Sequence, residues 1–472
     1  MGWHTPFESA KATIGPPLAV HQCECQPGAL ALDLALALAL ALDEIKEQAS
    51  ILLPLAGIRQ VLVDFILDFV RRSSKYGGWM DVAELRALLS PEGLRLLDEV
   101  GPIEATADVL RIVSRLRGAG HSGDLVAAVL GQARLRAKAR AKFGDFAARM
   151  LFTPDGLEQA TRLSVASLHA GRFAGAGIDV VADLGCGIGA DALAMAALDL
   201  GVLAVERDEL TAAIASFNLA PFAAARVELG DATTTDLTGV GGVWLDPARR
   251  AGGRRLDNPA DWSPALDWAF GLAETLPTGI KLGPGLDRSL LPEEGEAQWV
   301  SVDGEVVELA VWSGVLARPG VGRAALVLRS GSAAELTAAH DSEDADSGAL
   351  GEYLLEPDGA VIRARLIGDL ARSISGEGRM LDPTIAWITS DAAPETPFGA
   401  GFRVLERFPL DVKTLKKELA ARGIGTLEIK KRGVDVDPAA FRARLALKGD
   451  SSATLVLTRI AGARVALLAE RL

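Results

Sequence analysis

Cysteine is scarce in this chain, with only Cys23, Cys25 and Cys186 among 472 residues. So few thiols cannot form a disulfide framework, which excludes small secreted scaffolds and favours a reducing cytoplasm. His21 lies beside Cys23 and Cys25, but the sequence offers no fourth ligand at a spacing that suits zinc. We therefore expect a cytoplasmic protein without a metal site.

Long apolar runs are also lacking. The low-complexity run Ala29–Leu42 is shorter than the about 20 residues of a membrane span, and Asp33 interrupts it. No basic segment directly precedes this run, as one does in a secretory signal. A proline and three charged residues interrupt Ile51–Val70, which could instead form an amphipathic helix on a partner or a membrane surface. Because a regular helical pattern begins only at Met80, we expect residues 1–79 to be a disordered tail or an over-extended translation start, and we expect no membrane partner.

Basic residues are outnumbered, with 49 Lys and Arg against 62 Asp and Glu and a formal net charge of −13. The 49% of hydrophobic and 24% of charged residues are typical of a soluble globular protein, and the length predicts several domains. The acidic balance argues against nucleic acid bound along the whole chain. Between Arg403 and Arg464, however, 14 basic residues stand against 7 acidic ones, so a nucleic-acid partner at this end stays open.

Residues 80–150 have a helical pattern, with a loop at Gly118–Gly123. The stretch from Arg134 to Lys142 places five basic residues at alternate positions of an Ala-rich helix. Alternate spacing distributes these charges around more than half of the helix circumference. The stretch is therefore either a solvated face or a face directed at phosphates.

From Asp179 onward, short apolar strands alternate with helical segments, which predicts a largely parallel sheet with helices on both faces. Glu305–Trp312 and Ala324–Leu328 follow without a helix between them, so we expect a strand pair to close the sheet. We interpret residues 331–350 as an acidic linker and 351–402 as a connecting α+β segment. The other predicted strands are Val180–Leu184, Gly201–Glu206, Ala225–Leu229, Gly242–Leu245 and Gly279–Leu282.

A glycine-rich loop follows the first of these strands and contains Gly185, Gly187 and Gly189. Such a loop lets the backbone approach a nucleotide closely. Asp183 lies two residues before the loop, where a carboxylate can hold the ammonium of a bound amino acid, a group that dinucleotides lack. Glu206 closes the second strand and can accept hydrogen bonds from ribose hydroxyls.

Two further carboxylates follow the next two strands. Asp231, before Ala232, follows the third strand, where it can accept an exocyclic adenine amine. Asp246 ends the fourth strand and opens the segment Asp246-Pro247-Ala248-Arg249. Because ligands bind at the carboxyl edge of parallel strands, acids at four successive strand ends predict one cofactor site.

These residues resemble the class I S-adenosylmethionine-dependent methyltransferases. The resemblance is closer to an uncharacterised bacterial group of these enzymes with a C-terminal THUMP-like domain. It implies an α/β fold in which residues 151–330 form a Rossmann-like methyltransferase sheet, mostly parallel with a terminal antiparallel strand. It also implies an N-terminal helical region at 80–150 and an α+β THUMP-like domain at 403–472. The segments that carry this closer resemblance are 150–154, 246–250, 356–359, 381–384 and 430–433.

The resemblance implies S-adenosylmethionine as the cofactor. Asp183 would bind the methionyl amine, and Glu206 the ribose. Asp231 and Ala232 would bind the adenine. Phe152-Thr153-Pro154 is similar to the segment that packs over the cofactor in trimethylguanosine synthase and its relatives. The glycines that would line the cofactor are Gly185, Gly187 and Gly189.

By the same resemblance, Asp246-Pro247-Ala248-Arg249 occupies the place of the Asp/Asn-Pro-Pro-aromatic motif of enzymes that methylate exocyclic base nitrogens. The chain departs from that motif, because Ala248 replaces the second proline and Arg249 the aromatic residue. A guanidinium can also stack on a base. We expect Asp246 to hold or deprotonate the acceptor. Lys281, at the end of the fifth strand, would hold a phosphate or the acceptor, or only cap the sheet edge.

THUMP domains of known RNA-modifying enzymes bind RNA, so the resemblance implies a tRNA or rRNA base as the substrate. Lys430, Lys431 and Arg432 would contact phosphates, although a solvated basic turn is an equal alternative. A small-molecule methyltransferase and a non-catalytic protein that binds cofactor and RNA are rival hypotheses. A nicotinamide enzyme is disfavoured by Asp183 and by the terminal strand pair.

Overall fold

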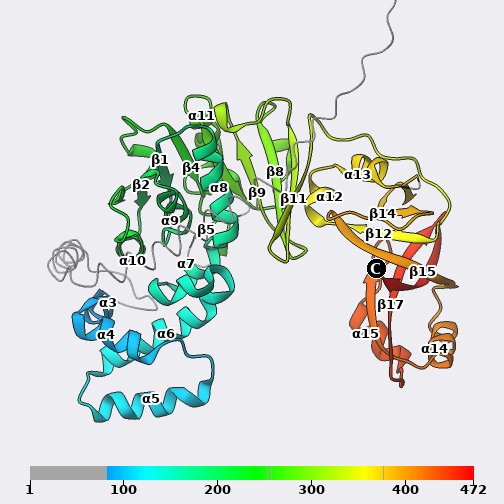
Figure 1. Cartoon of the computed structure of the whole chain (residues 1–472), viewed down its shortest axis with the longest axis horizontal. Helices are drawn as coiled ribbons and strands as arrows, with labels where there is room; N and C mark the ends of the chain where they lie inside the picture. Colours follow the sequence, from blue (N-terminus) through cyan, green and yellow to red (C-terminus); the bar gives the residue numbers. More distant parts are fainter. Residues whose placement is uncertain (1–81, 252–253, 257, 376) are drawn as a thin grey trace, which may run out of the picture.

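The computed structural model describes residues 82–251, 254–256, 258–375 and 377–472 (Figure 1). The predictions for residues 1–79, including the apolar runs and the possible ligands around Cys23, therefore lie outside the described residues. Within the described part, none of the helices has both the length and the apolar character that a membrane crossing requires. Figure 1 shows a helical region at one end, a large sheet in the middle and a second sheet at the other end.

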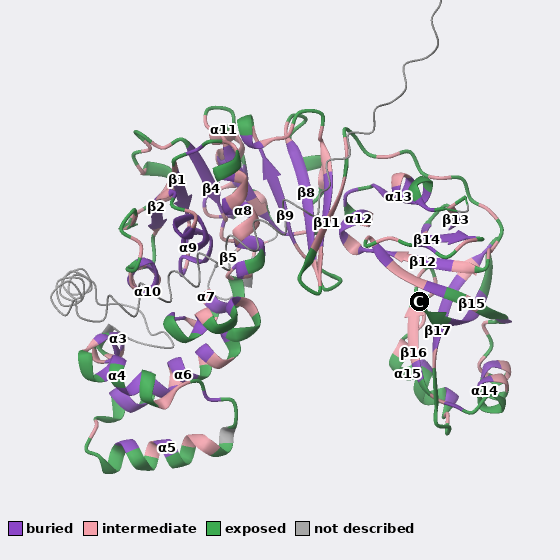
Figure 2. Ribbon diagram, in the orientation of Figure 1, coloured by how far each residue is buried: buried purple, intermediate pink, exposed green. Residues whose placement is uncertain are grey.

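The helical region begins with α3 (Val82–Leu89), α4 (Pro91–Val100), α5 (Thr106–Gly118) and α6 (Gly123–Phe143). The side chain of Ser90 accepts a hydrogen bond from the amide of Gly93, and the proline that opens α4 leaves no amide unsatisfied at its first position. Apolar side chains of α3, α4 and α6 form one core, whereas the outer side of α5 is exposed (Figure 2). The chain then continues through the 3-10 helix η1 (Gly144–Arg149), α7 (Pro154–Gln159) and α8 (Leu163–Gly175).

The central sheet has nine strands within the described residues, in the order β3-β2-β1-β4-β7-β9-β8-β10-β11. The five strands β3, β2, β1, β4 and β7 are parallel, and β9 is antiparallel to β7. This arrangement confirms the expected Rossmann-like sheet, which is mostly parallel with an antiparallel strand after β7. The strand bounds are β1 Val180–Leu184, β2 Gly201–Glu206, β3 Ala225–Leu229, β4 Gly242–Leu245, β7 Thr278–Leu282, β8 Glu296–Val302, β9 Glu305–Trp312, β10 Arg323–Arg329 and β11 Ser332–Ala338.

Successive side chains of these strands enter two different cores, as strand geometry requires. Val181 packs with α8, α9 (Ala190–Ala197) and α10 (Glu209–Leu219), whereas Ala182 belongs to the core on the opposite face. That second core contains residues of α11 (Leu266–Ala273), α12 (Gly359–Arg363) and α13 (Ile367–Ser373). Helices therefore cover both faces of the sheet, and the segment that follows residue 351 contributes to one of them.

The end of the central sheet differs from the prediction in two respects. The closing hairpin is formed by β8 and β9, and β10 pairs with β8 in parallel rather than with β9. The sequence analysis missed β8 because Glu296 and Gln298 interrupt its apolar pattern. Both are buried, and Glu296 is compensated by Arg172 and Arg318 at distances of 2.5 and 2.6 Å.

The predicted acidic linker at 331–350 is wrong for its first part. Ser332–Ala338 forms β11, which pairs antiparallel with β10 over seven residue pairs. Its Ser- and Ala-rich composition hides this strand, because the pairing with β10 and the ion pair between Glu335 and Arg318 stabilise it from outside the segment.

Among the described residues, the C-terminal sheet has seven strands in the order β13-β14-β12-β15-β18-β17-β16. The predicted boundary at residue 403 falls inside β15, which pairs with β12 on one side and with β18 on the other. Residues 351–402 and 403–472 thus share one sheet. Helices α14 (Val412–Ala421) and α15 (Pro438–Leu445) cover one of its faces. The strand bounds are β12 Tyr353–Pro357, β13 Arg379–Asp382, β14 Ile385–Ser390, β15 Gly399–Pro409, β16 Ile424–Lys431, β17 Ser451–Ile460 and β18 Ala463–Arg471.

Candidate cofactor and acceptor site

A cavity of about 570 Å³ lies at the carboxyl edge of the parallel strands. This volume is in the usual range for sites that bind small ligands. The cavity brings together residues from the ends of five parallel strands, from the glycine loop and from α7. The predicted site residues in its wall are Thr153, Asp183, Gly185, Gly187, Glu206, Asp231, Ala232, Asp246, Pro247, Arg249 and Lys281.

The glycine loop has a backbone that other residues would adopt only with strain. Gly185, Gly187 and Gly189 have φ angles of +86°, +56° and +83°, in the region that favours glycine. The amides of Gly185 and Cys186 both donate to the carbonyl oxygen of Val205, which ties the loop to β2. A Cβ atom added at Gly185 would lie 3.3 Å from the carbonyl oxygen of Asp246, so the loop passes close to the end of β4.

Asp183 is buried in the wall of the cavity, with 1% of its surface exposed. One carboxylate oxygen accepts a hydrogen bond from the amide of Ala192 at 3.1 Å. Burial, together with the negative charges of Asp191 and Asp246, raises the pKa of Asp183 well above its usual range. A ligand ammonium beside this carboxylate would offset that repulsion, so the residue fits a bound amino-acid group.

Glu206 and Asp231 are both held in fixed orientations. Glu206 accepts hydrogen bonds from the amides of Gly187 at 3.1 Å and Asp208 at 2.8 Å, although burial still raises its pKa. Asp231 accepts hydrogen bonds from the hydroxyl and the amide of Thr233, which lower the pKa of its carboxyl group. These bonds orient two carboxylate acceptors at neighbouring strand ends, at the positions where the sequence analysis expects the ribose and the adenine.

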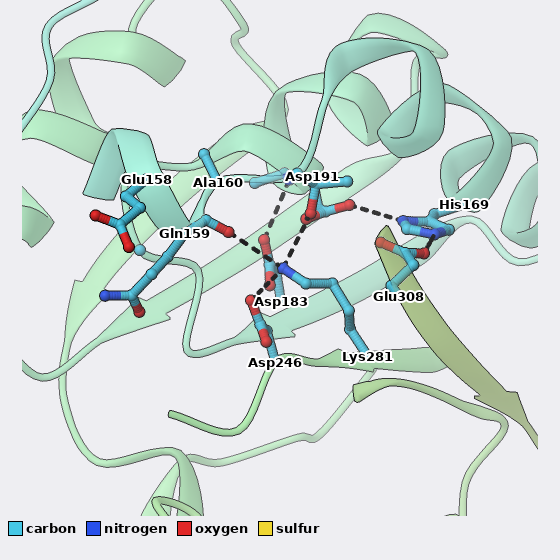
Figure 3. Close-up of polar contacts among 12 residues, drawn as sticks. Glu158, Gln159, Ala160, His169, Asp183, Asp191, Asp246, Lys281 and Glu308 are labelled. Carbon is cyan, nitrogen blue, oxygen red and sulfur yellow. Dashed lines mark hydrogen bonds and ion pairs between the residues drawn. The ribbon is translucent and has the colours of Figure 1, made fainter. Parts of the chain in front are cut away.

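Asp246 and Lys281 form a short ion pair, with 2.5 Å between Oδ2 and Nζ (Figure 3). The ammonium of Lys281 also donates to the hydroxyl of Thr161 at 3.2 Å and to the carbonyl oxygen of Gln159 at 3.5 Å. Burial raises the pKa of Asp246, and the charge of Lys281 opposes this effect. The pKa of Lys281 is raised because the attraction of Asp246, Asp191 and Glu308 exceeds the cost of burial. Lys281 is therefore cationic and fixes the orientation of the Asp246 carboxylate.

The sequence analysis missed four buried residues behind this ion pair, which are Thr161, His169, Asp191 and Glu308. Asp191 accepts a hydrogen bond from the hydroxyl of Thr161 at 2.7 Å and contacts Nδ1 of His169 at 2.8 Å. Nε2 of His169 lies 2.7 Å from Glu308 (Figure 3). We call the series Glu308, His169, Asp191, Thr161, Lys281 and Asp246 the buried ionic chain.

The charges along the buried ionic chain alternate. Burial disfavours the imidazolium of His169, but Glu308 and Asp191 more than compensate and raise its pKa to about 9. Burial likewise disfavours the Asp191 carboxylate, yet the hydrogen bond and charge of His169 lower its pKa. One signal could have indicated this cluster, because Glu308 is the only charged residue in the apolar stretch 306–312.

Arg249 occupies the place where the related motif has an aromatic residue. Two backbone hydrogen bonds between Ala248 and Ser263, at 2.8 and 3.1 Å, hold the segment 246–249 in place. A Cβ atom added at Gly283 would lie 1.9 Å from Nη1 of Arg249, so the guanidinium lies directly against this glycine. The cavity wall therefore presents a planar cation beside Asp246.

Three of the predicted cofactor residues lie beside the cavity rather than in its wall. Phe152 is fully buried, with its ring centroid 5.6 Å from that of Phe143. Pro154 is the first residue of α7, and Gly189 directly precedes α9. Thr153, which does line the cavity, caps α7 by accepting a hydrogen bond from the amide of Gly156 at 2.9 Å.

The basic stretch from Arg134 to Lys142 lies on α6, as expected. Arg136 is buried and donates to the carbonyl oxygen of Met150 at 3.0 Å, so neither a solvated nor a phosphate-facing position describes this residue. Lys142 is half-buried and lies in the cavity wall.

Lys430 and Lys431 are the last residues of β16 in the C-terminal sheet, and Arg432 follows them. Figure 1 shows this sheet at the end of the molecule opposite to β1, β2 and β4. Lys430 pairs with Glu356 at 3.1 Å, and Arg432 pairs with the same carboxylate at 3.6 Å. Arg432 also lies over the ring of Trp387. Lys431 is exposed. Two members of this trio are thus engaged within the domain, and Lys431 is the most accessible to a partner.

Comparisons with known proteins agree with this geometry. Two uncharacterized S-adenosylmethionine-dependent methyltransferases of Mycobacterium tuberculosis, from strains CDC 1551 and H37Rv, are each 34% identical over 340 residues, which cover 69% of this chain and 90% of the relative. A crystal structure from Porphyromonas gingivalis W83, described as a candidate methyltransferase, matches with a TM-score of 0.60 and 22% identity, covering 86% of this chain and 98% of that one. Residues 399–471 match the family model described as THUMP domain-like, and residues 81–139 match a domain of unknown function (DUF8688). The chain therefore belongs to a family of S-adenosylmethionine-dependent methyltransferases and carries a THUMP-like domain at its C-terminus.

Proposed function

We propose that this methyltransferase acts on RNA and transfers the methyl group to a base of tRNA or rRNA. The observation that carries the proposal is the THUMP-like domain joined to a methyltransferase sheet, since THUMP domains of known RNA-modifying enzymes bind RNA. The local excess of basic residues between Arg403 and Arg464 supports it, because phosphates attract such a surface. Exposed basic side chains in this part of the chain include Arg403, Arg407, Lys413, Lys416, Lys431, Arg444, Lys448 and Arg464.

A second basic segment lies next to the cavity. The sequence from Arg249 to Arg255 contains four arginines and directly follows Asp246-Pro247-Ala248. The backbone of Arg250–Ala251 pairs antiparallel with that of Arg254–Arg255. The sequence thus supplies further positive charge directly after Arg249, a residue of the cavity wall, and this charge would attract a polyanion.

The chemistry we propose for the cavity is an in-line methyl transfer to a base nitrogen. S-adenosylmethionine supplies an activated methyl group on sulfur. The acceptor nitrogen forms a bond to that methyl carbon while the carbon–sulfur bond breaks, and the nitrogen then loses a proton. In this proposal Asp246 accepts a hydrogen bond from the acceptor N–H and receives the proton, because burial raises the pKa of its carboxyl group toward that of a useful base. Lys281 holds this carboxylate in place, and the Arg249 guanidinium stacks on the base.

The test is transfer of labelled methyl from S-adenosylmethionine to total RNA from a strain that lacks this gene. The RNA is separated into tRNA-sized and ribosomal fractions, and binding of S-adenosylhomocysteine is measured on the same preparation. Label in one fraction, abolished by Asp246→Ala, is the expected result. An enzyme that binds S-adenosylhomocysteine but labels neither fraction would overturn the RNA proposal and would favour a small-molecule acceptor.

A further inference from the structure

The short helix α7 forms part of the cavity wall. It spans Pro154–Gln159, and its residues Asp155 and Gly156 line the cavity. A Cβ atom added at Gly156 would lie 2.5 Å from a side-chain carbon of Ile188, so α7 rests directly on the glycine loop. A helix of six residues is not stable by itself, which means that other parts of the chain must hold α7 in this place.

Lys142 provides much of that support at the C-terminal end of α7. Its ammonium donates to the carbonyl oxygens of Leu157 at 2.9 Å, Glu158 at 2.7 Å and Ala160 at 2.7 Å. The last carbonyls of a helix have no partner within the helix, and an ammonium group has three donors. One side chain from α6 therefore satisfies the end of α7.

The same turn also contacts the acceptor side of the cavity. Gln159, between two of the residues that Lys142 contacts, accepts a hydrogen bond from Lys281 at 3.5 Å. Figure 3 shows this residue with Glu158 and Ala160 next to the Asp246–Lys281 pair. The end of α7 is thus held between a lysine of the N-terminal helical region and a lysine of the central sheet.

We propose that Lys142 is a positioning residue for cofactor binding, which fixes α7 against the glycine loop and so makes the N-terminal helical region part of the cofactor site. This inference depends on the S-adenosylmethionine dependence of the family and not on the nature of the acceptor. Lys142 lies in the cavity wall, and its ammonium donates to the carbonyl groups at the end of α7, so we infer that its effect on the cofactor passes through α7.

The protonation of Lys142 gives the proposal a second observable. Burial and the nearby positive charges of Arg162, Lys281 and Lys138, opposed by Glu158, lower the pKa of Lys142 to about 8. Near pH 7 the group is mostly an ammonium with three donors, whereas near pH 9 it is mostly a neutral amine with two. The hold on α7 therefore weakens as the pH rises through 8.

The test uses three variants of the full chain. Lys142→Met keeps the length of the side chain and removes the donors, and Lys142→Arg keeps donors. Lys138→Met is the control, because Lys138 is an exposed neighbour. Binding of S-adenosylhomocysteine is measured by calorimetry at pH 7. We expect Lys142→Met to weaken binding about 10-fold, since charged hydrogen bonds are lost, and Lys142→Arg to recover most of it. Lys138→Met should bind as the wild type does. In methyl transfer with any accepted substrate, KM for S-adenosylmethionine should rise while kcat at saturation stays within about twofold.

A wild-type affinity for S-adenosylhomocysteine in Lys142→Met would overturn the proposal, whether or not its thermal unfolding midpoint falls. If Lys142→Met does not fold, the pH dependence decides. The wild-type protein should lose affinity between pH 7 and pH 9 by more than Lys142→Arg does, because Asp183 and the ligand ammonium titrate equally in both proteins. Identical pH profiles for these two proteins would also overturn it.

Discussion

His169 lies between two buried carboxylates, and its charge should make the stability of the methyltransferase domain depend on pH. Its Nδ1 is 2.8 Å from Asp191, its Nε2 is 2.7 Å from Glu308, and only 2% of the imidazole is exposed. Burial acts against the charged form, but the two carboxylates raise the pKa of His169 from 6.5 to about 9. Between these pH values the folded protein keeps a proton that the unfolded chain releases.

The sign and size of the effect follow from this difference. The stabilisation is fully present below pH 6.5 and is lost as the pH rises through 9. Each pKa unit corresponds to about 1.4 kcal/mol, so the free energy of unfolding should fall by roughly 3 kcal/mol across this window. His169→Gln removes the charge and leaves two buried carboxylates facing an amide. We expect it to unfold more easily at pH 6.5 by about 3 kcal/mol or more and to lose the part of the pH dependence that comes from His169.

Urea unfolding followed by tryptophan fluorescence at several pH values from 6 to 9 measures this effect. The fluorescence reports on the relevant core, because the ring centroids of Trp244 and Trp312 lie 4.2 and 5.9 Å from that of His169. His340→Gln is the matched control, since it removes an exposed histidine outside the buried ionic chain. Parallel curves for wild type and His169→Gln from pH 6.5 to 9, or a His169 resonance that titrates near 6.5 by NMR, would refute the reasoning.

Four further substitutions test separate parts of the site. Asp183→Asn should weaken binding of S-adenosylhomocysteine at least about 10-fold in calorimetry, because the ligand ammonium loses a charged partner, and unchanged affinity would remove Asp183 from cofactor binding. Asp246→Ala should bind S-adenosylhomocysteine normally but lower kcat about 100-fold or more, and full turnover would exclude it from the chemistry. Gly283→Ala places a Cβ atom 1.9 Å from the guanidinium of Arg249, so kcat/KM for the acceptor should fall while the affinity for the cofactor stays constant. A loss of cofactor affinity with an unchanged kcat/KM for the acceptor would contradict this. Lys431→Ala should reduce the slope of log affinity for RNA against log salt concentration by about one unit, and an unchanged slope in filter binding would show that Lys431 contacts no phosphate.

Strands β1, β2 and β4 could be predicted because each is a short, largely apolar run that is followed or ended by a charged residue or a glycine. Strand β3 also lies at the predicted residues, although it contains Arg226 and Glu228, because it continues the alternation of strands and helices. Strand β8 could not be predicted in this way, because it buries Glu296, and one of the two residues that compensate this charge, Arg172, lies more than a hundred positions earlier on α8. Local patterns do not report such partners.

The same distinction holds for the site. Asp183, Glu206, Asp231 and Asp246 follow from topology alone, since the carboxyl ends of parallel strands meet at one edge. His169 could not be found in this way, because its significance comes from contacts with Asp191 and with Glu308, which lies 139 residues away. Lys142 was part of a recognisable basic stretch, but its function in the fold depends on the carbonyl groups of α7, which carry no sequence signal.

The most direct test of the central claim is a comparison of methylated nucleosides by mass spectrometry. Digested tRNA and rRNA are compared from wild-type cells, from cells that lack the gene, and from the latter complemented with the wild-type chain or with Asp246→Ala. The proposed function predicts that one methylated nucleoside disappears on deletion, returns with the wild-type chain and does not return with Asp246→Ala. The same set of nucleosides in all four strains would contradict an RNA methyltransferase that works through Asp246.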